Sequence, residues 1–85
     1  MLREYRKNGV STITIEALQC LSRANSWIHC ATLKSKPSIE IYTNLLTWDD
    51  NSMKINCKID VDGKVYFRSG TTGDYIFYYG TVNFS

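Results

Sequence analysis

The side chains most suited to chemistry are a single histidine, His29, and three cysteines, Cys20, Cys30 and Cys57. A Cys–His pair can supply a nucleophile with its base, and the same residue types bind zinc. The spacing favours neither, because a strand would turn the neighbours His29 and Cys30 to opposite faces, and paired metal-ligand spacings are absent. We therefore predict no catalytic residue, no metal site and no cofactor. A small ribonuclease-like toxin that uses His29 is the remaining enzymatic alternative.

A second set of side chains combines positive charge with aromatic rings and is expected on solvent-facing strand positions. Its members are Lys58, Tyr66, Arg68, Tyr75, Phe77 and Tyr79. Tyrosine and arginine are enriched at the centres of protein interfaces. Rings interleaved with cations also suit single-stranded DNA or RNA. We assign this set to partner binding, with a protein as the main hypothesis and a single-stranded nucleic acid as the alternative.

The composition is that of one small folded domain, residues 1–85. The chain has 85 residues, 44% hydrophobic and 21% charged, which excludes a disordered tail or a collagen-like repeat. A domain of this size has little room for both a core and a deep cleft, which favours action through a surface. The net charge of only +2 weakens the nucleic-acid alternative, although the arm at residues 1–9 carries basic side chains.

The cysteine count and the N-terminal residues bear on location. An odd number of cysteines argues against a closed set of disulfides, and no apolar stretch of the kind found in a secretory signal follows the basic residues 1–7. No window approaches the roughly 18 consecutive apolar residues of a membrane span. We expect reduced cysteines, a cytoplasmic location and no membrane contact.

One helix is predicted after residue 15. Leu18, Leu21 and Ala24 recur at three- to four-residue spacing, which is typical of one helix face, and Asn25 is a plausible stop. The preceding residues are ambiguous: 1–9 read as a short basic helix, a first strand or a mobile arm, and 10–15 read as a strand or a helix start. The pair Asn8-Gly9 favours a turn.

The rest of the chain reads as β-structure, with strands expected at 27–33, 38–43, 53–61, 64–68 and 75–84. The clearest is 53–61, where apolar and polar residues alternate. The alternation of apolar and polar residues selects the loop length, and with it the register, of the following hairpin. A three-residue loop at 61–63 pairs Ile59 with Val65 and Cys57 with Phe67, so apolar side chains face each other across the two strands. Lys58, Tyr66 and Arg68 then share the solvent-facing side.

These elements predict an α+β fold: one N-terminal helix packed on a four- to five-stranded antiparallel sheet in two layers. The last strand has bulky side chains on both faces, so it is either central or an edge that can pair with a partner or a second copy. The function predicted is a small non-enzymatic inhibitor or accessory protein. Its class would be that of phage or plasmid anti-defence, immunity or antitoxin proteins, which occlude a macromolecular partner.

Overall fold

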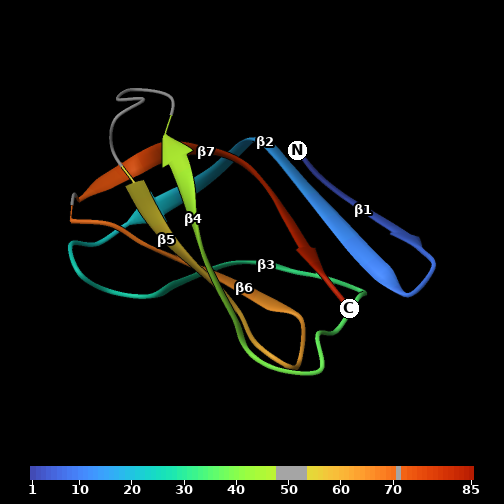
Figure 1. Ribbon diagram of the computed structural model, residues 1–85. Helices are drawn as coiled ribbons and strands as arrows, with labels where there is room; N and C mark the ends of the chain where they lie inside the picture. The colour runs from blue at the N-terminus through green and yellow to red at the C-terminus, as the bar shows by residue number, and fades with distance from the viewer. Residues whose placement is uncertain (48–53, 71) are drawn as a thin grey trace.

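The computed structural model describes residues 1–47, 54–70 and 72–85, and in these residues the protein is all-β (Figure 1). The strands are β1 (Leu2–Lys7), β2 (Val10–Ser22), β3 (Ile28–Thr32), β4 (Ile41–Thr47), β5 (Lys54–Ile59), β6 (Lys64–Arg68) and β7 (Gly73–Phe84). They form one antiparallel sheet in the order β1-β2-β7-β4-β5-β6-β3. The predicted α+β fold is therefore wrong: the described residues contain no helix, and the segment assigned to one lies largely in β2.

A narrow link divides this sheet into two layers. Within residues 1–47, 54–70 and 72–85, β7 and β4 share only the pairs Leu46–Tyr79 and Thr47–Tyr78, and the sheet folds over there. The layer β1-β2-β7 packs against the layer β4-β5-β6-β3, with Tyr78 and Phe67 in contact across the interior at a ring-centroid distance of 4.1 Å. The buried core draws on both layers: Ile13, Ile15, Leu33, Ile55, Cys57, Ile59, Val65, Phe67, Tyr78, Val82 and Phe84.

A β-bulge explains why part of β2 reads as a helix. Ile15 pairs with Gly80 and Leu18 with Tyr78, so β2 has one extra residue at this point. Ala17 occupies the left-handed region there, with φ 48°. The extra residue moves the inward positions from odd to even numbers, which creates a three-residue step between Ile15 and Leu18 that imitates helical spacing.

Two predicted turns are confirmed. Asn8 and Gly9 both have positive φ, 53° and 79°, between the paired residues Lys7 and Val10, as the primed two-residue hairpin turn requires. The backbone N–H of Asp60 donates to the carbonyl of Lys64 at 3.0 Å, which closes the predicted three-residue loop at 61–63, and the predicted pairs Ile59–Val65 and Cys57–Phe67 form.

The open side between the two layers is closed by contacts from β1 and β2. Cys20 in β2 and Cys30 in β3 form a disulfide, so the prediction that these cysteines are reduced is wrong. The buried hydroxyls of Ser22 and Ser69 lie 2.8 Å apart and add a second link between the layers. No sequence pattern pairs these two cysteines, because their strands become neighbours only after the sheet folds over.

The C-terminal strand is interior rather than an edge. β7 lies between β2 and β4 in the strand order, and the two edge strands are β1 and β3. Three of its bulky side chains, Tyr78, Val82 and Phe84, belong to the core. The alternative that places this strand at an edge, free to pair with another chain, is therefore wrong, and the alternative that makes it central is confirmed.

Candidate functional site

The strongest candidate site lies on the solvent-facing side of β4, β5, β6 and β3. Tyr42 pairs with Lys58, Lys58 with Tyr66, and Tyr66 with His29, so one row of side chains crosses four neighbouring strands. Paired residues point to the same side of a sheet, and strands lie about 4.8 Å apart, so the row spans about 14 Å. Three aromatic or heteroaromatic rings and one cation are thus aligned by backbone pairing alone.

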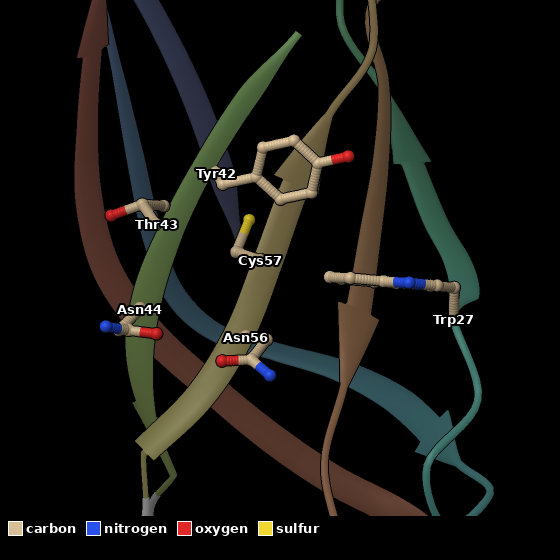
Figure 2. Close-up of a pocket in the computed structure, with 6 residues that line it drawn as sticks. All are labelled: Trp27, Tyr42, Thr43, Asn44, Asn56 and Cys57. Carbon is tan, nitrogen blue, oxygen red and sulfur yellow. The ribbon is translucent and has the colours of Figure 1, made fainter.

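A second row runs beside the first. Asn44 pairs with Asn56, and Asn56 pairs with Arg68. Trp27 directly precedes β3 and is half-buried. Its indole lies across β6 and points toward β5 (Figure 2), and the Lys58 ammonium is 4.8 Å from its ring centroid. Trp27 therefore bridges the two rows.

Cation–π contacts hold the charged side chains of this surface. The Lys58 ammonium is also 4.8 Å from the Tyr66 ring centroid, and the Arg68 guanidinium carbon is 5.8 Å from that of Trp27. Such contacts contribute about 0.5–1 kcal/mol at exposed sites and more where water is excluded. We call Trp27, His29, Tyr42, Lys58, Tyr66 and Arg68 the aromatic–cationic face. Both cations of this face contact aromatic rings.

The rings also contact one another. The ring centroids of Trp27 and Tyr42 are 6.3 Å apart at an interplanar angle of 65°, an edge-to-face arrangement. His29 and Tyr66 are 5.5 Å apart and tilted. Tyr42 remains 65% exposed, the largest exposure of the three aromatic side chains Tyr5, Tyr42 and Phe77 that stand out from the described surface. The face is therefore ordered at its centre and accessible at its β4 side.

A pocket of about 230 Å³ opens within this face (Figure 2). It is lined by Trp27, Tyr42, Thr43, Asn44, Asn56 and Cys57, none of which is charged. Thr43 and Cys57 are a cross-strand pair, and Cys57 is fully buried, with its side chain on the core side of the sheet. Trp27 and Tyr42 form aromatic walls, and two exposed carboxamides lie on neighbouring strands.

The carboxylates that border the face are already engaged. The Tyr42 hydroxyl donates a hydrogen bond to Glu40, and this bond, with smaller effects of desolvation and charge, raises the pKa of Tyr42. Asp60 accepts hydrogen bonds from the backbone N–H groups of Asp62 and Lys64, both at 3.0 Å. The rows Tyr42–His29 and Asn44–Arg68 contain no carboxylate, so their own charge is positive.

His29 is not arranged as a catalytic base for a cysteine. Its Nε2 lies 3.0 Å from the Thr32 hydroxyl, and its neighbour Cys30 is in the disulfide. The remaining thiol, Cys57, points to the opposite side of the sheet, and burial raises its pKa to about 12. The described residues also contain no group of three or more histidine, cysteine or acidic side chains that could hold a metal ion.

Only part of the set of residues predicted to bind a partner lies on one surface of the structure. Lys58, Tyr66 and Arg68 lie together, as predicted. Tyr79 lies on the outer side of β7, where it pairs with Leu46, and Phe77 is 36% exposed opposite Gln19 of β2. These two residues belong to the other layer. The side chain of Tyr75 is outside the described part of the structure.

Sequence reasoning missed the contributions of Trp27, Tyr42 and Asn44 to this surface. Alternation along 38–43 does place Tyr42 on a polar side. Nothing local indicates that β3 pairs with β6, which is what brings Trp27 to the Lys58 ammonium.

Within the described residues, no helix is long and apolar enough to cross a membrane. Comparison of the chain with protein-family models, with curated proteins and with solved structures finds no match in any of the three.

Proposed function

We propose that this protein is a non-enzymatic binding protein and that its aromatic–cationic face binds single-stranded nucleic acid. The observation that carries the proposal is the pair of adjacent rows in which Lys58 lies between Tyr42 and Tyr66, Arg68 contacts the Trp27 ring, and no carboxylate intervenes. Single-strand binders combine rings, on which bases stack, with cations that contact phosphates. Both are present here within the width of four strands.

The same arrangement weighs against the protein-binding hypothesis in the form the sequence suggests. That hypothesis depends on the surplus of aromatic residues in the last strand and on its availability as an edge. Tyr78 and Phe84 are instead core residues, and β7 is interior. In the layer β4-β5-β6-β3, the accessible aromatic residues that lie with cations are those of the aromatic–cationic face.

A protein partner remains the second candidate. The three residue types most enriched at interface hot spots are all present on this face, as Trp27, Tyr66 and Arg68. Lys58 contacts the rings of both Trp27 and Tyr66, and Arg68 contacts that of Trp27, so they form one contact network. An inhibitor or accessory protein that occludes a partner, of the kind found in phages and plasmids, would use the same surface. A homodimer stays a prediction, and it no longer has an edge strand at the C-terminus to support it.

The location bears on either candidate. The expectation of a cytoplasmic location depends on reduced cysteines, whereas a disulfide such as Cys20–Cys30 is more common in oxidising compartments. Cys20 and Cys30 pack against the core, on the inner side of the sheet. The disulfide therefore lies on the opposite side of the sheet from the aromatic–cationic face, and the binding experiment can be made on the oxidised protein.

The test is fluorescence anisotropy of a labelled 12-nucleotide oligo(dT) with the oxidised protein, over a range of salt concentrations. We expect binding whose affinity falls with salt. The slope should become shallower by about 0.7 for each phosphate that Lys58→Ala or Arg68→Ala no longer neutralises. Lys7→Ala is the matched control, because Lys7 is an exposed cation at the distant end of the β1–β2 hairpin (Figure 1).

Two results would overturn the proposal. One is the absence of binding at low salt. The other is an equal loss in Lys7→Ala, which would indicate a diffuse charge effect. Capture of one protein at near-stoichiometric yield from nuclease-treated lysate, with binding abolished in Tyr66→Ala and Arg68→Ala, would favour the protein candidate instead.

A further inference from the structure

We infer that His29 makes the binding of single-stranded nucleic acid to the aromatic–cationic face depend on pH, because its protonated ring is a third cation of that face and contacts a phosphate of the bound strand. This inference rests on the proposed function and adds a form of regulation to it. His29 is the only histidine of the chain. An imidazole is the ordinary side chain that gains a positive charge between about pH 8 and pH 5.

The position of His29 places this charge at the end of a row that already binds a cation. Its cross-strand partner on β6 is Tyr66, whose own partner on β5 is Lys58. The Tyr66 ring centroid lies 5.5 Å from that of His29 and 4.8 Å from the Lys58 ammonium. Neighbouring strands are about 4.8 Å apart, so a nucleic-acid strand that passes Lys58 and Tyr66 along this row reaches His29 next.

The contacts of His29 are compatible with both states of its ring. Its Nε2 lies 3.0 Å from the Thr32 hydroxyl, and a hydroxyl either donates or accepts a hydrogen bond. A tyrosine ring attracts a cation within about 6 Å of its centroid, so the contact with Tyr66 persists when the imidazole is charged. The side chain of His29 is also exposed. Protonation therefore changes the charge of the face without requiring the ring to move.

The charged groups around His29 leave it without a competing carboxylate on its side of the strands. Among the described side chains of β5 and β6, the charged or titratable ones on that side are Lys58, Lys64, Tyr66 and Arg68. Asp60, at the end of this hairpin, accepts backbone hydrogen bonds from its own turn. β2, which the disulfide joins to β3, has Glu16 as its only charged residue, before the bulge.

A phosphate of the bound strand supplies the negative charge that these strands lack. Protonation of His29 then strengthens binding of the strand, and the bound strand favours protonation to the same extent, because linkage is reciprocal. The cations Lys58 and Arg68 are charged at every pH in this range, so only the contribution of His29 changes. Affinity is therefore expected to rise as the pH falls from 8 to 5.5.

The experiment measures anisotropy of labelled 12-nucleotide oligo(dT) with the oxidised protein at pH 5.5 and pH 8, over a range of salt concentrations. We expect binding about two- to fivefold tighter at pH 5.5, the range of one exposed ion pair. The salt dependence should be steeper there by about 0.7, the value of one further phosphate. His29→Gln should bind at both pH values as the wild type does at pH 8. His29→Arg, with a fixed charge, should bind at both as the wild type does at pH 5.5.

The outcomes separate this inference from the proposed function. His29→Gln keeps every other titratable group, so a pH dependence of equal size in this variant would overturn the assignment to His29. Binding of the wild type with the same affinity and salt dependence at both pH values would overturn the inference alone. Absence of binding at both would overturn the proposed function as well. Circular dichroism at the two pH values confirms that each protein is folded.

Discussion

The carboxylate of Glu4 in β1 accepts a hydrogen bond from the backbone N–H of Ser35, in the segment after β3, at 2.8 Å. A second bond, 3.0 Å long, comes from the N–H of Lys34. β1 and β3 are the two opposite edges of the sheet, so this one side chain joins the ends of the strand order. Together with the Cys20–Cys30 disulfide, it closes the open side of the fold.

This link should weaken in acid. Partial burial raises the pKa of Glu4. Hydrogen bonds from Lys34 and Ser35 and the nearby Lys34 charge lower this pKa by a larger amount, so the net shift is downward. A carboxyl with a lowered pKa adds stability that is complete above its unfolded value, near 4.5, and that is lost as the pH falls through the folded value. The contribution of such a solvent-accessible group is at most about 1 kcal/mol.

Urea denaturation of the wild type and Glu4→Gln at pH 6 and pH 3 measures this contribution. We expect the variant to be less stable at pH 6 and the difference to shrink at pH 3. Glu16→Gln, which removes a carboxylate from β2, is the control for the loss of one negative charge elsewhere on the sheet. A Glu4→Gln deficit of equal size at both pH values would contradict the expectation.

The disulfide should be a major source of stability. It joins residues separated by 10 positions, and closing a loop of this size is expected to stabilise the folded state by about 3 kcal/mol. Denaturation with and without reductant, or of the Cys20→Ala/Cys30→Ala double variant, should reveal a loss near this value. The free energy of unfolding of a small domain is only a few kcal/mol in total, so the reduced protein should be close to unfolding.

Thiol labelling checks the same bond and the buried Cys57 together. Burial raises the pKa of the Cys57 thiol to about 12, so almost no thiolate forms at pH 8. The folded protein should resist iodoacetamide at pH 8. The chain unfolded without reductant should take up one label, on Cys57, and the reduced chain three. Three labels without reductant would show that the disulfide does not form.

Gly63 should be the least replaceable glycine of those at 9, 63 and 70. Its φ is 86°, and a Cβ there would lie 2.8 Å from the carbonyl oxygen of Leu33. A left-handed backbone alone costs an alanine about 1–2 kcal/mol, and Gly63→Ala should lower the free energy of unfolding by more than this. Gly9→Ala, with φ 79° and open space, should cost about that amount, and Gly70→Ala little. Thermal or urea denaturation of the three variants gives the order, and an equal loss in all three would refute it.

The β5–β6 hairpin could be predicted because all its information is local. One register is indicated by three features together: the alternation in 53–61, the turn residue Gly63 and the polarity of the paired side chains. A cross-strand pair such as Cys57–Phe67 follows from that register. The same locality places Lys58, Tyr66 and Arg68 on one side. Half of the candidate site is therefore readable from one hairpin.

The remainder of the fold depends on contacts between distant segments. The bulge at Ala17 shifts the parity of β2, and only its pairing with β7 reveals that the apolar residues still face one side. The pairing of β3 with β6 leaves β3 next to a strand that lies far along the chain, and it carries Trp27 to Lys58. Periodicity within one segment contains no information on either pairing.

Trp27 should be essential for binding although it lies outside the predicted set. Its ring contacts Tyr42, Lys58 and Arg68, so Trp27→Ala removes a stacking surface and the support of both cations. We expect oligo(dT) binding to weaken by about 1–3 kcal/mol, the range of one stacked base. Phe77→Ala, which removes an exposed ring from the outer side of β7, is the control and should bind as the wild type does.

A double-mutant cycle distinguishes the removal of a stacking surface from a failure to position Lys58. If Trp27 holds the Lys58 ammonium in place, Lys58→Ala should weaken binding less in the Trp27→Ala background than in the wild type, since the side chain is then already unrestrained. Additive losses would mean that the two residues act separately. A loss in Phe77→Ala as large as that in Trp27→Ala would move the binding surface to the β1-β2-β7 layer.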